Sequence, residues 1–526
     1  MYSIDTYKTP FWAENGGFTR GRDPLGIQNS SITLYGRLLP GMTNLTLRVR
    51  YYGFYCWILY EYDRLPNRKD WKTLTQHYNF IRRGELLIGY IMAHTSSEQL
   101  SIIGSDFVGN HLNEIDNIGY YDIGAGADKF KNTPKGSVYW DYSSGALGQY
   151  YAGSLINLGL IEVVDKFFHI KDDGIKLAKA YMQSISENSR KLFLEYLEKG
   201  KIDLDGIIKL EEFGIHKISI SSAEWNFYRQ LLLRDDGEYF KTSDDKVASK
   251  RKQTIFLYLN YCKNNTPEQS FQVYRYDVFE NHNSIDNSTF GWYYFFLIET
   301  YHYALETIFW AMLNELDGRI ISVADFIESI IKIIQKNIRK YFKFDQEESL
   351  SKIISSLQKR DLVRELSSLE QLTKAKQNSQ KALGMAVLLI IQTYLNIQEN
   401  LESISKFEDL NYLKGQKGNI TEVTEQYINK YKQCDIQNYL ESIIKTIIND
   451  HISTAFRKMG NGESNRLKFI IEDNLISHVE TMEPKHTNPR IKTLHNFMTD
   501  LGFIDQKQKV TRDGQVLIDE IALKND

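Results

Sequence analysis

The chain has 526 residues, of which 25% are charged, and its formal net charge is −3. A chain of this length is expected to form about three domains with ample core. The near-neutral balance excludes a global basic field that would draw the chain onto nucleic acid, so any nucleic-acid site has to be local. The three cysteines, Cys56, Cys262 and Cys434, form no CxxC pair. This argues against a disulfide scaffold or a zinc ribbon and fits a reducing cytosol.

Proline is scarce, with eight residues in the whole chain, far below the usual roughly 5%. Because proline breaks helix interiors, this scarcity predicts a mainly α-helical protein. The first residues contain no basic segment followed by an apolar one, so we expect no signal peptide. The apolar stretch Met385–Ile391 is too short for a bilayer, which needs about 20 residues. We therefore expect a cytoplasmic protein.

In chain order, residues 10–43 are rich in turn formers and should be irregular structure on a domain surface. A helix of about 18 residues is predicted next, capped by Thr43 or Asn44 and aromatic almost all round, so it should be buried. A second amphipathic helix is expected from Gly84.

Residues 190–460 read as a long helical region. It should hold a buried helix over 288–318, ended by Gly318, and amphipathic helices over 325–342 and 350–372. Breaks are expected at 234–246, 263–269 and 460–464, the last being the best linker by its Gly, Asn and Ser content. These features predict three domains, 1–190, 191–460 and 465–526.

One phrase occurs twice, as LGLIEVVDKFFHIKDDG at Leu158–Gly174 and as LGFIDQKQKVTRDG at Leu501–Gly514. Each copy predicts a helix that ends at glycine, a short strand, a turn, a returning strand and a closing helix. In the first copy we expect DKFF to be the turn and Asp172 or Asp173 to cap the closing helix.

This order resembles the second half of bacterial winged helix-turn-helix domains, over about 40 residues of the first copy and 34 of the second. A chance hairpin between two helices is the alternative. The resemblance implies a mainly α multi-helix protein in which two winged-helix modules contribute short β-hairpins.

A winged helix can set its recognition helix in the DNA major groove, with phosphate contacts from Lys and Arg. The first recognition helix, Ser143–Leu158, contains no Lys or Arg, so we interpret that copy as a protein-binding or structural module. The second copy offers candidate DNA-binding residues, although solvated surface charge would give the same pattern. These residues are Arg490, Lys492, His495 and Asn496 on the helix, and Lys507, Lys509 and Arg512 around the wing.

A second basic feature lies upstream, where residues 25–60 hold no acid but include Arg37, Arg48 and Arg50. Arg48 and Tyr52 would share a helix face at a spacing of four. These arginines could bind phosphate or stack on bases. Equally, they could cap carbonyls or pair with acids of the middle region.

The sequence shows no motif for catalysis, a cofactor or a metal. IGAGADKF at Ile123–Phe130 lacks the spacing of a phosphate-binding loop, and ENHNSIDN at 280–287 lacks the context of a His-Asn nuclease. Glu299 and His302 form an ExxH pair, as in di-iron bundles. Its only counterpart, Glu483–His486, contains a proline and reads as loop, so we expect a core pair.

The stretch Arg22–Leu59 resembles the N-terminal signature of a bacterial family associated with anti-phage defence, some members of which are encoded beside SMC/ABC-type ATPases. The layout is also similar to kleisin-like subunits, whose two winged helices engage ATPase heads. These resemblances imply a non-enzymatic adaptor that binds DNA and a partner ATPase. A winged-helix transcriptional regulator, or a nuclease without a recognisable motif, is the alternative.

Overall fold

The computed structural model describes residues 22–65, 73–96, 102–234, 251–264, 288–340, 348–358, 365–410, 413–414, 418–460, 466–487 and 490–523. Over these residues the fold is mainly α-helical with a few short strands, which confirms the predicted class. The chain divides into two compact units. Unit 1 comprises residues 1–35 and 272–487, and unit 2 comprises 36–271 and 488–526.

These units differ from the three contiguous domains expected from the sequence. Residues 191–271 and the C-terminal segment belong with the N-terminal helices, and residues before 36 belong with the middle region. The difference arises because core contacts join segments far apart in the chain, such as the ring contact between Tyr52 and Phe497. Most of the residues predicted as breaks lie outside the described ranges.

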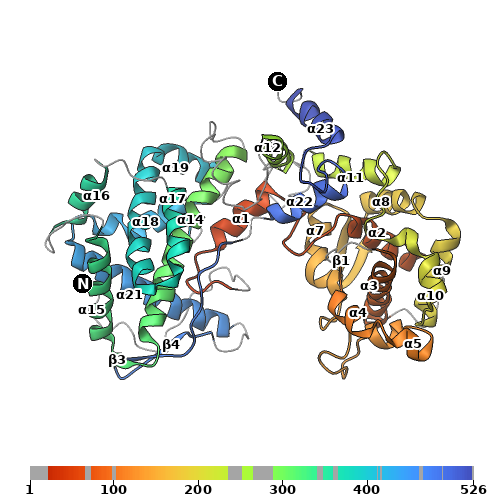
Figure 1. The fold of residues 1–526 in the computed structure, drawn as a ribbon, viewed down its shortest axis with the longest axis horizontal. Helices are drawn as coiled ribbons and strands as arrows, with labels where there is room; N and C mark the ends of the chain where they lie inside the picture. The colour runs from red at the N-terminus through yellow and green to blue at the C-terminus, as the bar shows by residue number, and fades with distance from the viewer. Residues whose placement is uncertain are drawn as a thin grey trace. The chain divides into compact units, whose positions relative to one another are not determined.

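Unit 1 is a helical bundle with a small sheet at one end (Figure 1). The buried helix α14 packs along α18, and α15 packs against both α18 and α21. The sheet is antiparallel with strand order β3-β5-β4. The elements are α1 (Asn29–Leu38, shared with unit 2), α14 (Ser288–Leu316), β3 (Ile320–Ser322), α15 (Val323–Ile338), α16 (Leu350–Gln358), α17 (Glu365–Lys374), η5 (Ala375–Gln377), α18 (Ser379–Glu399), α19 (Leu401–Leu410), α20 (Ile420–Tyr427), η6 (Asn429–Tyr431), α21 (Ile436–Gly460), β4 (Phe469–Glu472) and β5 (Leu475–His478).

One helix among the described residues, α18, is long and apolar enough to cross a membrane by length and composition. Its apolar window is 78% buried within the protein, because α14, α15 and α17 cover it. Helix α18, which contains the stretch Met385–Ile391, is therefore a core helix of unit 1.

Unit 2 is built around α2, whose residues from Arg50 to Leu59 are all buried. The helices α3 and α8 pack against it, and α11 packs on α8. The elements are α2 (Arg50–Arg64), α3 (Leu74–Thr95), α4 (Ser105–His111), α5 (Glu114–Ile118), α6 (Ile123–Ala127), the π turn η3 (Leu147–Tyr151), α7 (Ala152–Asn157), β1 (Ile161–Val164), β2 (Phe167–Ile170), α8 (Asp172–Gln183), α9 (Glu187–Lys199), α10 (Leu204–Lys209), η4 (Glu211–Phe213), α11 (Ala223–Leu233), α12 (Arg251–Asn264), α22 (Ile491–Asp500) and α23 (Arg512–Leu523).

The buried aromatic helix and the helix ending before Gly318 are confirmed as α2 and α14, but some boundaries were wrong. Helix α2 begins at Arg50 without a side-chain cap, because its N-cap residue, Val49, has no polar side chain. Thr43 lies in an earlier turn, where its amide donates to the hydroxyl of Thr46. Helix α3 begins at Leu74, ten residues before the predicted start at Gly84. Thr73 and Gln76 form a capping box at its first turn.

Residues 22–28 are irregular, as expected, but they are not a surface loop. Leu25 and Ile27 are buried, and the Asp23 carboxylate accepts hydrogen bonds from the amides of Gly26, Ile27 and Gln28. Burial is tolerated because the polar backbone is satisfied. Helix α1 follows within the stretch predicted to lack helix.

Candidate nucleic-acid interface

Both copies of the repeated phrase form a helix, a hairpin and a closing helix within unit 2. We call residues 147–183 the first repeat and residues 491–523 the second repeat. In each, the leading helix ends at a glycine in the left-handed region, Gly159 with φ 69° and Gly502 with φ 71°. Glycine adopts this conformation without the steric cost of a Cβ, which explains why Leu-Gly recurs.

The residue after each glycine closes the hairpin in the same way. Leu160 and Phe503 donate back to the leading helix and accept from the residue before the closing helix. The hydrogen bonds are Leu160 N to Leu155 O (2.9 Å), Lys171 N to Leu160 O (2.9 Å), Phe503 N to Met498 O (2.9 Å) and Thr511 N to Phe503 O (3.0 Å). The repeated phrase therefore encodes one local geometry, built twice.

The hairpin of the first repeat, residues 161–170, is here called the first wing. Its strands β1 and β2 are antiparallel, with Val164 opposite Phe167, so the turn is Asp165 and Lys166, both at positive φ. The prediction that DKFF is the turn was wrong, because both phenylalanines lie in β2. The closing helix α8 begins with Asp172 and Asp173 in its first turn, and neither caps it.

The exposed residues of the first wing are two valines and three charged residues, namely Val163, Val164, Glu162, Asp165 and Lys166. Val163 and Val164 are 46% and 48% exposed. Ile156, on the preceding helix α7, is also exposed. Because Glu162 and Asp165 outnumber Lys166, this wing offers little to a phosphate backbone, and its exposed valines are suited to a protein contact.

The hairpin of the second repeat, residues 504–510, is here called the second wing. It is shorter, with a single bridge between Ile504 and Val510. Lys507 and Lys509 on this wing and Arg512 at the start of α23 are all exposed. Three exposed cations within six residues of chain are the strongest local basic feature among the predicted DNA-binding residues.

Most of the predicted recognition-helix residues are engaged within unit 2. Arg490 donates to the carbonyl of Leu39 (3.2 Å), and Asn496 donates to that of Leu47 (3.3 Å). His495 Nδ1 lies 2.8 Å from the hydroxyl of Tyr258, and burial lowers the pKa of His495. Only Lys492, among the four helix residues predicted to touch DNA, is exposed.

Two interpretations were open for Arg48 and Arg50, and the structure shows both arginines paired with acids. Arg50 is fully buried, forms an ion pair with Glu224 (3.1 Å), and donates to the carbonyls of residues 212 and 214. Burial works against its charge, but Glu224 raises the pKa of Arg50. Arg48 pairs with Asp500, and Arg37 is half-buried and engaged. The alternative interpretation, carbonyl capping and acid pairing, describes Arg50 and Arg48.

The two repeats share one core. The ring of Tyr52 on α2 contacts Tyr151 of the first repeat (6.0 Å between centroids) and Phe497 of the second (5.5 Å). Trp225 on α11 donates to the carbonyl of Leu501 (2.8 Å) and contacts Phe503. Large aromatic rings therefore pack the two repeats against one another within unit 2.

The residues discounted for catalysis form no metal site in the described part of the chain, where no group of three or more His, Cys, Asp or Glu side chains is arranged to hold an ion. Gly124 and Gly126 lie in α6, which Asp122 caps. Residues 280–287 lie outside the described ranges. Glu299 and His302 form a buried pair on α14, as predicted. The ring of His486, from the second ExxH sequence, stacks on Tyr303 of the same helix.

Comparison of the chain with protein-family models, with curated proteins and with solved structures gives no match.

Proposed function

We propose that this chain is a non-enzymatic adaptor of a bacterial anti-phage defence complex, in which the second wing contacts DNA phosphates and the first wing binds a protein partner. The partner implied by the sequence resemblance is an SMC/ABC-type ATPase. The observation that carries the proposal is the contrast between the wings. The second wing exposes Lys507 and Lys509, with Arg512 exposed beside it on α23, whereas the first wing exposes Val163 and Val164.

The DNA contact in this proposal is limited to the backbone. Lys and Arg that neutralise phosphates give affinity without reading sequence. The helix α22 has Asn496 and His495 turned to partners within unit 2, so base readout is not part of the proposal. Non-specific, salt-sensitive binding through the second wing is the expected behaviour, and it would distinguish the adaptor from a promoter-specific regulator.

Fluorescence anisotropy of the full chain with a labelled duplex, across a salt series, tests the DNA contact. The test variant replaces Lys507, Lys509 and Arg512 with Ala. The control replaces three other exposed lysines of unit 2, Lys176, Lys191 and Lys209, and so removes the same charge elsewhere.

We expect the logarithm of affinity to fall with the logarithm of salt, and the test variant to lose up to about three units of slope, near 0.9 per phosphate contact. The control should keep its slope. Absence of binding at low salt, or an equal loss in the control, would contradict the DNA contact. Binding that prefers one sequence would support the regulator, and metal-dependent cleavage would support the nuclease.

Co-purification with a tagged SMC/ABC-type ATPase from the same locus tests the protein contact. Charges in place of the exposed valines of the first wing, in the variant Val163→Asp with Val164→Asp, should abolish capture because burying a charge is costly. Ile208→Asp on α10 is the control, since Ile208 is equally exposed in the same unit. Equal capture of the wing variant and the wild type would contradict this part of the proposal.

A further inference from the structure

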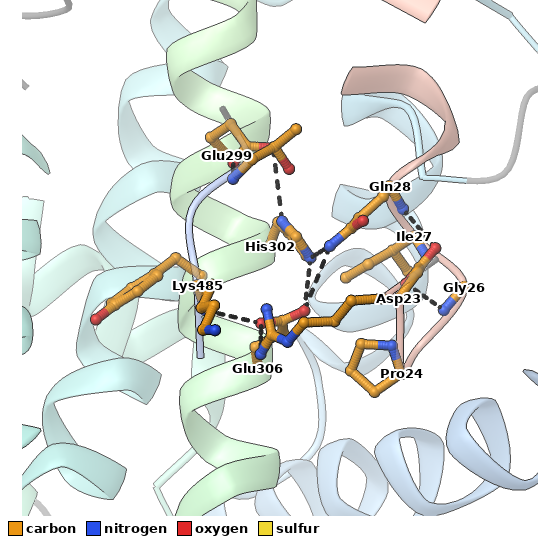
Figure 2. A network of polar contacts seen from close by, with 12 residues as sticks. Asp23, Pro24, Gly26, Ile27, Gln28, Glu299, His302, Glu306 and Lys485 are labelled. Atoms are coloured by element: carbon orange, nitrogen blue, oxygen red, sulfur yellow. Dashed lines mark hydrogen bonds and ion pairs between the residues drawn. The ribbon is translucent and has the colours of Figure 1, made fainter. Parts of the chain in front are cut away.

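Helix α14 carries three ionisable side chains in its buried face, at spacings of three and four. Glu299, His302 and Glu306 are each no more than 1% exposed. Nε2 of His302 lies 3.0 Å from Oε1 of Glu306, and Nδ1 lies 3.5 Å from Oε1 of Glu299 (Figure 2). Buried charges are costly unless they are paired, so this arrangement needs a structural reason.

The remaining oxygens of the two glutamates hold segments that are distant in sequence. Oε2 of Glu306 accepts from the amide of Lys485 (3.1 Å) and pairs with Arg22 (3.0 Å). Oε2 of Glu299 accepts from the amide of Thr487 (2.7 Å). Figure 2 shows Gln28 and Lys485 approaching α14 from separate segments, and the side-chain nitrogen of Gln28 donates to Oε1 of Glu306 (3.5 Å).

These segments lead to two of the places where the chain leaves unit 1. Residues 22–28 lead into α1, within which the chain passes to unit 2 between residues 35 and 36. Residues 485–487 end at the passage between residues 487 and 488. We call residues 22–28 the first connector and residues 485–487 the second connector.

The charges of the cluster balance, with His302 and Arg22 opposite Glu299 and Glu306. Burial works against a charged imidazole, but the two glutamates raise the pKa of His302 well above its usual 6.5. Burial likewise opposes the Glu299 charge, while the charge of His302 and the hydrogen bond from the Thr487 amide hold the pKa of Glu299 down to about 2. The directions of both shifts favour the charged forms of His302 and Glu299.

We propose that the Glu299–His302–Glu306 cluster is a latch that fastens both connectors to α14, so that loss of one member releases the two connectors together. This inference is independent of the proposed function. It depends on His302, which joins the carboxylate that holds Thr487 to the carboxylate that holds Arg22 and Lys485.

Other contacts distinguish the connectors. The first is also held by α21, since Lys458 donates to the carbonyl of Asp23 and His451 donates to that of Pro24. The second is held by α14 through the two carboxylates and the stacking of His486 on Tyr303. The second connector should therefore respond more strongly when the latch is broken.

Hydrogen exchange of the full chain, read by mass spectrometry, tests the latch with the variant Glu306→Gln. The decisive amide is that of Thr487, because it bonds to Glu299 and has no bond to the substituted residue. The control is Glu408→Gln. Glu408 is an equally buried carboxylate of unit 1 that accepts from Tyr294 and from the amide of Thr421.

We expect exchange to rise at least roughly tenfold at residue 487 and measurably at residues 26–28 in Glu306→Gln, since a buried charge network loses a member. Peptides from α18 should keep their exchange rates. An unchanged rate at residue 487, or a rise no larger than in the Glu408→Gln control, would overturn the latch. If Glu306→Gln fails to fold, Arg22→Gln serves the same readout, because Arg22 is 28% exposed. A rise confined to the first connector in that variant would also overturn the latch.

Discussion

A Cβ placed on Gly174 would lie 2.1 Å from the carbonyl oxygen of Leu160, the residue that closes the first wing. In the second repeat the same relationship joins Gly514 to the carbonyl of Phe503, at 2.2 Å. Neither glycine has a positive φ, so the requirement is the close approach of two backbones and not a left-handed conformation. This shared contact explains the Asp-Gly that ends both copies of the repeated phrase.

Gly174→Ala and Gly514→Ala should each destabilise unit 2 by about 1–3 kcal/mol, because backbone has to move to admit the methyl group. Urea denaturation of the full chain measures the change. Gly153→Ala is the control, since Gly153 lies in α7 and a methyl group added there would have no atom within 4 Å. That variant should be neutral or slightly stabilising. Equal effects in all three variants would refute the backbone contact.

Glycine spacing made the repeats predictable, because the Leu-Gly helix ends and the Asp-Gly contacts are local. The ion pair between Arg50 and Glu224 was not predictable, because the two residues lie 174 positions apart in the sequence. Arg and Glu are also residue types that usually lie at the surface. For the same reason, Arg48 and Arg490 read as candidates for phosphate until their partners were known. Strand β3 was also missed, because a three-residue strand carries no periodic signal and pairs with β5 more than 150 residues later.

The candidate site likewise has one part that the sequence predicted and one part that it did not. Exposure of the cations at 507, 509 and 512 follows from a turn rich in polar residues, which the sequence displays directly. Covering of α22 by the segment 39–49 follows from long-range packing, as in the hydrogen bond from Thr493 to the carbonyl of Thr43. A motif therefore located the wing, while the accessible face of the helix before it required the structure.

The buried pair of Arg50 and Glu224 should make unit 2 sensitive to loss of either charge. Glu224→Gln leaves the guanidinium buried without a counter-charge and should cost about 3–5 kcal/mol in urea denaturation. Replacing both residues, as Arg50→Met with Glu224→Leu, should recover part of this loss. Recovery stays incomplete because Arg50 also donates to the carbonyls of residues 212 and 214.

Glu187→Gln is the control for that pair, because Glu187 forms an exposed ion pair with Lys191 on α9. Its denaturation midpoint should match the wild type, since exposed pairs contribute little. A wild-type midpoint in Glu224→Gln would show that the buried pair does not stabilise unit 2.

The first wing should loosen in acid through His77. The amide of Phe168 on β2 donates to Nε2 of His77 on α3 (3.2 Å), and burial lowers the pKa of His77 from 6.5 to about 3. When the ring is protonated, Nε2 carries a hydrogen and can no longer accept the hydrogen bond from the amide of Phe168. Because the folded pKa is depressed, this stabilisation is present above pH 6.5 and is lost as pH falls toward 3, with a slope of up to about 1.4 kcal/mol per unit.

Hydrogen exchange of residues 167–170, followed against pH and corrected for intrinsic exchange, checks this behaviour. His77→Gln cannot titrate and should flatten the acid dependence of these residues. An acid response that is as steep in His77→Gln as in the wild type would assign it to another group.

Unit 1 should lose stability at both ends of the pH range, through two histidines with opposite shifts. The raised pKa of His302 means that its stabilisation is complete below pH 6.5 and is lost in alkali, as pH rises through the folded value. Burial lowers the pKa of His451 to about 4. Nε2 of His451 accepts a hydrogen bond from the amide of Lys468, which requires the neutral ring. Its stabilisation is present above pH 6.5 and is lost as pH falls toward 4.

Urea denaturation across pH, read by exchange of unit 1 peptides, separates the two histidines. His302→Gln should remove the alkaline loss and leave the acid loss in place, and His451→Gln should do the reverse. Tyrosines also titrate in alkali, but they are common to both variants, so the difference between the curves isolates His302. If the alkaline limbs of the two variants coincide, His302 is not charged in the folded protein, and its contacts with Glu299 and Glu306 are not ion pairs.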